Sequence, residues 1–312
     1  MNYRRLGRSD LIVSEIGFGA WAIGGDAHGN SYGPTDDAES LAAVKRALDL
    51  GCNFFDTADV YGWGHSEELL GRALKGVRKE VVIATKVGGD FYSGRVRMNF
   101  SPDYIRFALE RSLERLQTDY IDLYQLHNPT LEMIKEGSVF EPMERLKEEG
   151  KIRFYGVSIF PPIEGVEAIR RKLPDAIQVV YNIFSPEPAL ELFPLAIKEG
   201  VGIVAREPLA NGMLTGKYRA DSKFPATDIR CAWPRGYLKA RVEAADRLKP
   251  IAARHSLTLA QLALKFVLSH SAVSAAIVGI KTAKQAEENL AASDGRHLSD
   301  EEQVEILRVV FG

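Results

Sequence analysis

Two stretches of the chain have the same design: GCNFFDTADVYG at residues 51–62 and VVIATKVGG at residues 81–89. Each contains a short apolar run, rich in aromatic or β-branched residues, that ends in polar or charged residues followed by glycine. Runs that are almost continuously apolar are typical of strands buried on both faces. Amphipathic segments of helical length separate these runs from one another. The pattern predicts parallel strands joined by helices.

Eight such runs alternate with helical segments along the chain. They cover Ile16–Ala20, Asn53–Ala58, Val81–Val87, Ile121–Leu126, Phe154–Ser158, Ala176–Tyr181, Gly202–Arg206 and Ala275–Val278. Strict alternation without a break in composition predicts a closed (β/α)8 TIM barrel, an α/β fold in which residues 1–312 form a single domain. A doubly wound open sheet is the alternative. The glycines from Gly17 onward do not fit its GxGxxG turn, because position 22 is alanine.

The ends of several helices are marked by their capping residues. Ser101 before Pro102 indicates a helix start. Two pairs predict capping boxes: Asp36 with Glu39, and Ser299 with Glu302. Three glycines predict left-handed helix ends just before strands: Gly51, Gly150 and Gly200.

Two segments lie outside the strand and helix alternation. Residues Tyr3–Val13 predict an N-terminal hairpin that turns at Gly7–Asp10 and caps the bottom of the barrel. The stretch Ala210–Leu238 is rich in glycine, proline and polar residues and is too long for an ordinary connection. Loops of this length commonly close over a ligand, so we expect a lid or clamp there.

The composition narrows the class of protein. Of the 312 residues 46% are hydrophobic and 26% charged, and the net charge of −2 gives no electrostatic reason to expect nucleic acid or a membrane surface as partner. Cys52 lies in an apolar run far from Cys231, which favours a buried, reduced thiol over a disulfide. No apolar stretch resembles a leader or a membrane span, and the six histidines lack the spacing of metal ligands. We therefore expect a cytoplasmic protein without a bound metal.

Polar residues gather where the predicted strands end, which is where the active sites of such barrels lie. Asp56 and Tyr61 follow the second strand, Lys86 ends the third, and His127 follows the fourth. Each of these residues alone has an ordinary structural explanation. Together at one barrel mouth, they predict a catalytic site.

The four residue types suggest one kind of chemistry. A free tyrosine has a pKa of about 10, and we expect the ammonium group of Lys86 to lower the pKa of Tyr61. Asp56 would keep Lys86 charged, and His127 would hydrogen-bond a substrate oxygen. This set can protonate a carbonyl that is being reduced, but it contains no hydride source. An alternative role for Lys86 is to form a Schiff base, as in an aldolase.

The chain also resembles the aldo-keto reductases over essentially its whole length, most closely their bacterial general-reductase and potassium-channel-β-subunit-like branch. The motifs that carry the resemblance are Gly17-Phe18-Gly19-Ala20-Trp21, Asp56-Thr57-Ala58-x-x-Tyr61-Gly62, Ala84-Thr85-Lys86, Asp119-Tyr120-Ile121-Asp122-Leu123 with Leu126-His127, Gly156-Val157-Ser158, Gln178 with Tyr181-Asn182, Leu214-Thr215-Gly216-Lys217-Tyr218, and Gly279 with Gln285 and Asn289. The resemblance implies an NADPH-dependent enzyme, with NADH as the other possible cofactor. It implies a small carbonyl or alcohol substrate and leaves the oligomeric state open.

The resemblance also implies roles for individual residues. The catalytic tetrad is Asp56, Tyr61, Lys86 and His127, and the substrate contacts are Trp21, Tyr61 and His127. Ser158 and Gln178 match residues that hold the nicotinamide carboxamide. The loop Leu209–Lys217 matches the segment that covers the pyrophosphate. The full set of implied cofactor-binding residues is Gly19, Ala20, Trp21, Asp56, Ser158, Gln178, Arg206, Pro208, Leu209, Asn211, Leu214, Gly216, Lys217, Gly279, Lys281, Gln285, Glu288 and Asn289.

The chain departs from the family pattern at two of these places. Ile159 stands where the family has asparagine, and Arg206 stands where an aromatic residue commonly stacks on the nicotinamide. A cation there predicts weaker binding of NADP⁺ relative to NADPH. Lys281 is the one evident cation for a 2′-phosphate, and Gln285 is also placed to form a capping box with Thr282.

Two expectations concern what the protein does with its site. Because the chain ends at Gly312 directly after its last helix, we expect an open pocket and broad substrate tolerance. The alternative to an active reductase is a cofactor-binding, redox-sensing regulatory subunit of low turnover.

Overall fold

The computed structural model describes residues 1–172 and 174–312, and in it eight parallel strands close into a barrel. Each barrel strand pairs with the next one along the chain, and the last pairs with the first. The predicted barrel is therefore confirmed and the open sheet is wrong. The strands are β3 (Ile16–Gly19), β4 (Phe54–Asp56), β5 (Val82–Val87), β8 (Ile121–His127), β9 (Ile152–Ser158), β10 (Ala176–Val180), β11 (Gly202–Arg206) and β12 (Val273–Gly279).

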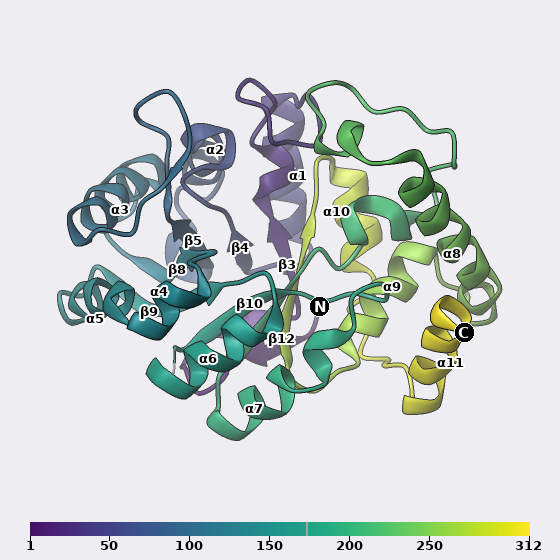
Figure 1. Cartoon of the computed structure of the whole chain (residues 1–312). Helices are drawn as coiled ribbons and strands as arrows, with labels where there is room; N and C mark the ends of the chain where they lie inside the picture. The colour runs from purple at the N-terminus through teal and green to yellow at the C-terminus, as the bar shows by residue number, and fades with distance from the viewer. Residues whose placement is uncertain (173) are drawn as a thin grey trace.

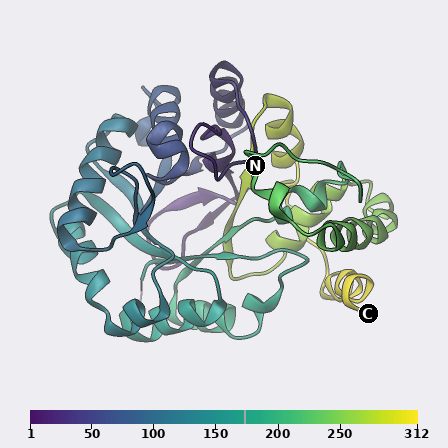
Figure 2. The same cartoon turned by 45° about the horizontal axis from the view of Figure 1, so that its top comes forward.

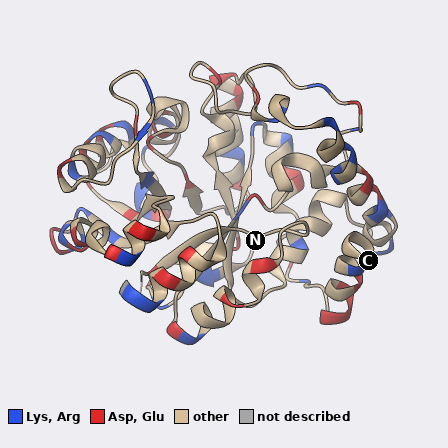
Figure 3. Ribbon diagram, viewed as in Figure 1, with Lys and Arg blue, Asp and Glu red and all other residues tan. Residues whose placement is uncertain are grey.

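Helices surround the barrel, as the two views in Figures 1 and 2 show. Their bounds are α1 (Asp37–Asp49), α2 (His65–Ala73), α3 (Pro102–Leu116), α4 (Leu131–Glu136), α5 (Glu141–Glu148), α6 (Pro162–Lys172), α7 (Leu192–Glu199), α8 (Arg235–Arg254), α9 (Leu259–Leu268), α10 (Ala283–Leu290) and α11 (Asp300–Phe311). Residues of both charges, Lys and Arg as well as Asp and Glu, are spread along these outer helices (Figure 3). No helix in the described part of the chain is long and apolar enough to cross a membrane.

The alternation of side chains along each strand decides what faces the barrel interior. In β4, Phe54 packs in a small interior cluster with Val82 and Leu123, whereas Phe55 packs in the larger core between strands and helices. Asp56, two residues after Phe54, therefore points into the barrel at its mouth. The same period of two places Lys86 in line with Val82 and Ala84.

The N-terminal hairpin closes the bottom of the barrel, as predicted. It consists of β1 (Tyr3–Arg5) and β2 (Ile12–Ser14), which pair antiparallel. Leu6, Leu11 and Val13 are buried in the interior cluster with residues of the barrel strands. At the turn, the N–H of Arg8 donates to the carbonyl of Gly200 at 2.7 Å, which ties the hairpin to the start of β11.

Most predicted helix ends are confirmed. The side chain of Ser101 accepts a hydrogen bond from the N–H of Tyr104, and Ser299 forms a complete capping box with Glu302. Gly51, Gly150 and Gly200 have φ values of 87°, 73° and 70°. The capping box predicted at Asp36 is only half formed: among the described residues, Asp36 accepts from the N–H of Glu39 and the reverse bond is absent.

The long segment predicted as a loop is partly helical. It contains two 3₁₀ turns, Ala210–Thr215 and Ile229–Ala232, and its last four residues belong to α8. The segment lies beside the loop that follows β3, where the N–H of Ile229 donates to the carbonyl of Ser31 at 3.0 Å (Figure 1). Cys52 is buried and Cys231 exposed, and neither forms a disulfide, as expected.

Gly7→Ala is expected to lower the free energy of unfolding by about 2 kcal/mol or more. Gly7 has a φ of 54°, and an added methyl group would lie 2.3 Å from the backbone nitrogen of Gly202. Urea unfolding measures the loss. Gly76→Ala is the matched control, because Gly76 has a φ of 91° but no heavy atom within 4 Å of the added methyl. Equal losses in the two variants would contradict the packing of the hairpin against the barrel.

Candidate active site

A buried lysine joins three of the predicted catalytic residues. The Nζ atom of Lys86 donates to Oδ1 of Asp56 at 2.5 Å, to the carbonyl of Thr57 at 2.7 Å and to the hydroxyl of Tyr61 at 3.3 Å. These three partners satisfy the three donors of the ammonium group. The end of β4 supplies the carboxylate and the carbonyl, the following 3₁₀ turn supplies the hydroxyl, and β5 supplies the ammonium.

Two glutamines complete the environment of Asp56. Its Oδ2 atom accepts from Nε2 of Gln178 at 2.7 Å and from Nε2 of Gln125 at 3.1 Å. Gln178, which was expected at the nicotinamide carboxamide, thus holds the carboxylate of Asp56 in this structure. Sequence reasoning missed Gln125. Its signal was a polar residue two positions before His127 in the same strand, which places both side chains on the same face.

Lys86 and Tyr61 both hold their protons at neutral pH, because the pKa of each group is raised. Burial alone would lower the pKa of Lys86, but the charge of Asp56 and the contact with Tyr61 raise this pKa above its usual value. Burial raises the pKa of Tyr61, and it outweighs the lowering by Lys86. The expected lowering of the Tyr61 pKa is therefore wrong in its net direction. At neutral pH the site holds a charged lysine beside a neutral phenol.

His127 lies next to the same phenol. Its ring centroid is 5.8 Å from that of Tyr61, and the two planes are nearly perpendicular. Burial lowers the pKa of His127 well below its usual value, and the charges of Lys86 and Arg206 lower it further. The imidazole is thus neutral at physiological pH, with one N–H to donate. On the other side, the ring centroid of Trp21 lies 6.3 Å from that of Tyr61.

A cavity of about 390 Å³ lies along the barrel mouth and is lined by Trp21 and Tyr61, whereas His127, the third expected substrate contact, does not line it. Most residues expected at the cofactor line it: Gly19, Trp21, Asp56, Gln178, Arg206, Pro208, Leu209, Asn211, Lys217, Gly279, Lys281, Gln285, Glu288 and Asn289. Four expected residues do not line it. The side chains of Ala20 and Leu214 pack in the core, Ser158 is buried at the end of β9, and Gly216 is exposed beyond the rim.

The cavity wall also contains residues that sequence reasoning missed. Tyr32 comes from the loop after β3, and Arg230 comes from the long segment after β11. Arg230 forms two hydrogen bonds to the carboxylate of Asp228 and lies 4.6 Å from the ring centroid of Tyr32. The sequence offered only a weak signal for them, namely a tyrosine and an arginine in otherwise polar loops. Tyr32 and Arg230 come into contact because the two loops pack against each other.

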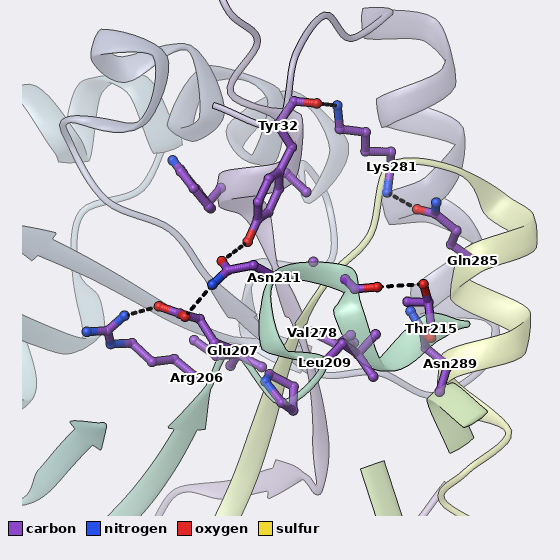
Figure 4. A pocket seen from close by; sticks show the side chains of 18 of the residues that line it. Tyr32, Arg206, Glu207, Leu209, Asn211, Thr215, Val278, Lys281, Gln285 and Asn289 are labelled. Atoms are coloured by element: carbon purple, nitrogen blue, oxygen red, sulfur yellow. Dashed lines mark hydrogen bonds and ion pairs between the residues drawn. The ribbon is translucent and has the colours of Figure 1, made fainter. Parts of the chain in front are cut away.

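Lys281 also contacts the loop after β3 that carries Tyr32. Its Nζ atom donates to the carbonyls of Tyr32, Gly33 and Pro34 at 2.9, 3.3 and 3.2 Å (Figure 4). The side-chain oxygen of Gln285 accepts from the N–H of Lys281 at 2.8 Å. Thr282 accepts from the N–H of Gln285, so only this half of the predicted capping box is formed.

A chain of hydrogen bonds crosses the cavity wall between Tyr32 and Arg206 (Figure 4). The hydroxyl of Tyr32 donates to Oδ1 of Asn211, whose Nδ2 donates to Oε2 of Glu207 at 2.8 Å. The other carboxylate oxygen of Glu207 lies 2.5 Å from Nη1 of Arg206. Among the residues that the structure describes, no group of three or more His, Cys, Asp or Glu side chains could hold a metal ion.

Comparison with known proteins agrees with this geometry. The model of the Aldo/keto reductase family matches residues 15–310. The chain belongs to this family. It is 35% identical to the aldo-keto reductase YhdN of Bacillus subtilis over 98% of this chain and 92% of that protein. It is 33% identical to a probable voltage-gated potassium channel subunit beta of Oryza sativa, covering 99% of this chain and 96% of that one.

Solved structures of aldo-keto reductases superpose on nearly the whole chain. The glycerol dehydrogenase AKR11B4 from Gluconobacter oxydans has a TM-score of 0.84 at 31% identity, with 99% of this chain and 94% of that chain covered. The holo form of AKR11C1 from Bacillus halodurans has a TM-score of 0.81 at 35% identity, with coverages of 99% and 96%. This aldo-keto reductase is therefore an oxidoreductase enzyme with a (β/α)8 barrel.

Asp56→Asn is expected to lower the free energy of unfolding by about 3 kcal/mol, because it leaves the ammonium of Lys86 buried without a counter-charge. Denaturant unfolding at pH 7 measures this loss. The double variant Asp56→Asn with Lys86→Met should recover most of it, since no buried charge remains. A loss of less than about 0.5 kcal/mol in the single variant would show that Lys86 is not held as a buried cation.

Proposed function

We propose that this aldo-keto reductase reversibly reduces aldehydes or ketones with a nicotinamide cofactor, NADPH in preference to NADH, and that Tyr61 is its general acid and base. The observation that carries the proposal is the hydrogen bond from buried Lys86 to the Tyr61 hydroxyl, 3.3 Å long, at one end of the cavity. A neutral phenol beside a buried ammonium can give up its proton and leave a phenolate that the ammonium stabilises.

The cavity suits an elongated ligand that carries phosphate groups. Lys217, Arg230 and Lys281 all line it, and the pKa of Lys281 is lowered by burial and by the charges of Arg230 and Lys217. Such a cluster of cations favours a polyanion. Figure 4 places Lys281 at the opposite end of the cavity from Arg206, whose charge acts on Tyr61, so a dinucleotide would span from Lys281 to Tyr61.

We infer which residues would hold each part of the cofactor. Gln178, which lines the cavity, would bind the carboxamide, whereas buried Ser158 does not line the cavity. The segment from Leu209 to Lys217 would cover the pyrophosphate. Lys281, Gln285, Glu288 and Asn289 would surround the adenosine end. The chain matches the holo form of the Bacillus halodurans enzyme with a TM-score of 0.81 and its apo form with 0.74, so its backbone is more similar to the holo form.

The residues of the site divide the reaction between them. When bound, the nicotinamide supplies the hydride that the carbonyl carbon receives. Tyr61 donates its hydroxyl proton to the carbonyl oxygen, which becomes the alcohol oxygen. Lys86 stabilises the phenolate that remains, and Asp56 keeps Lys86 charged. Neutral His127 donates a hydrogen bond to the same oxygen and orients the substrate. In the reverse direction, the phenolate of Tyr61 takes the proton back.

The two alternatives have less support. A lysine that forms a Schiff base attacks as the neutral amine, whereas Asp56 and Tyr61 raise the pKa of Lys86. A regulatory role rests on the relatives that are named potassium channel subunits. The buried proton-donating pair favours catalysis.

The names of the relatives suggest which substrates to test. They include a glycerol dehydrogenase, an L-galactose dehydrogenase from Arabidopsis thaliana and an NADH-specific methylglyoxal reductase from Escherichia coli. A panel of methylglyoxal, other short aldehydes and ketones, glycerol and L-galactose, followed by absorbance of the reduced cofactor, tests the proposed reaction in both directions. We expect turnover with at least one carbonyl.

Tyr61→Phe is expected to lower turnover by about a hundredfold or more, because it removes the proton donor. The dissociation constant of NADPH, measured by fluorescence titration, should stay within about twofold, because the phenol ring is kept. Tyr104→Phe is the matched control: its hydroxyl is also buried, and Tyr104 does not line the cavity. Substantial activity in Tyr61→Phe would rule out the assigned general acid.

Lys281→Ala is expected to raise the dissociation constant of NADPH about tenfold and to change that of NADH much less, because the 2′-phosphate loses its cation. Titrations with both cofactors measure the two effects. Lys284→Ala removes the same charge from an exposed position in the first turn of α10 that does not line the cavity. Equal weakening of both cofactors by Lys281→Ala would contradict a 2′-phosphate contact.

A further inference from the structure

Arg206 is held rigidly at the reacting end of the cavity. It is the last residue of β11, and its Nη2 atom donates to the carbonyl of Ile159 at 3.1 Å. Its guanidinium carbon lies 4.7 Å from the ring centroid of Phe160, and Nη1 lies 2.5 Å from a carboxylate oxygen of Glu207. The side chain is only 15% exposed. A hydrogen bond from the Arg206 side chain to the main-chain carbonyl of Ile159 thus connects the two positions at which the chain departs from the family pattern.

The positive charge of Arg206 acts on Tyr61 and His127. Arg206 lines the cavity together with Tyr61 and Gln178. Its guanidinium also opposes the rise of the Tyr61 pKa and contributes to the lowering of the His127 pKa. A planar ring lying beside the Tyr61 hydroxyl would therefore have Arg206 as a neighbour.

Glu207 is an unexpected residue in a cavity that is suited to phosphates. A carboxylate repels a polyanion, so its presence calls for a compensating role. Its backbone has a φ of 55°, a strained value for a residue other than glycine. Two contacts hold it in this conformation: Nδ2 of Asn182 donates to its carbonyl at 3.0 Å, and Nδ2 of Asn211 donates to its carboxylate at 2.8 Å.

We propose that Glu207 is a positioning residue that holds Arg206 beside the nicotinamide site and neutralises it, and that this ion pair sets the balance between oxidised and reduced cofactor. The inference rests on the proposed nicotinamide cofactor. The oxidised ring carries a positive charge and the reduced ring carries none, so a neighbouring charge changes the affinities of the two forms by different factors. The hypothesis that Arg206 by itself disfavours NADP⁺ leaves out the counter-charge that Glu207 supplies.

The test is the ratio of the dissociation constants of NADP⁺ and NADPH, measured by calorimetry and fluorescence titration on the whole protein. Glu207→Gln keeps the shape of the side chain and removes its charge. It should raise this ratio about tenfold, because Arg206 is then uncompensated. Arg206→Gln should lower the ratio by a similar factor, because Glu207 then attracts the oxidised ring. The double variant should return to the wild-type ratio.

Glu288→Gln is the matched control, because it removes a carboxylate from the same cavity near its adenosine end. Its ratio should equal that of the wild type. If Glu207 only shapes the loop, Glu207→Gln and Arg206→Gln would weaken the binding of NADP⁺ and NADPH equally. An unchanged ratio in both variants would overturn this inference and leave the proposed function standing. If the wild-type protein bound neither form, the proposed function would fail and the inference with it.

Discussion

The arrangement of the site depends on the buried ion pair between Lys86 and Asp56. Lys86 is fully buried, and an unpaired charge in such a place is strongly destabilising. The pair therefore ties the end of β4 to the end of β5. Gln125 and Gln178 extend the network from Asp56 to β8 and β10. Because Tyr61 is bonded to the same ammonium, the position of its hydroxyl follows from contacts that the fold needs for its own stability.

The same network separates the roles of neighbouring groups by their protonation. Lys86 keeps its charge because Asp56 and Tyr61 compensate for burial. Tyr61 keeps its proton because burial outweighs the effect of Lys86. His127 is neutral because burial and two cations disfavour its charged form. A charged ammonium, a protonated phenol and a neutral imidazole thus lie within a single cluster, which suits the proton transfer to a carbonyl oxygen that we propose.

Much of the fold and the centre of the site could be predicted because they depend on local patterns. Strands buried on both faces leave continuous apolar runs, and a period of two places Asp56 and Lys86 inside the barrel mouth. The net pKa direction of Tyr61 could not be predicted, since it depends on how completely the phenol is buried. Tyr32 and Arg230 were missed because two loops far apart in sequence bring them together. Ala20 and Leu214 carry family motifs, but their side chains fill the core.

The N-terminal hairpin has a consequence for the supply of protons. Leu6, Leu11 and Val13 close the barrel from below, and the interior above them is filled by apolar side chains such as Phe54 and Leu123. The barrel is therefore closed at its bottom and open at its mouth. The side chains of this interior cluster are apolar and carry no group that could relay a proton. In the mechanism that we propose, a proton that Tyr61 gives away would therefore return from the mouth, along the path that substrate and product use.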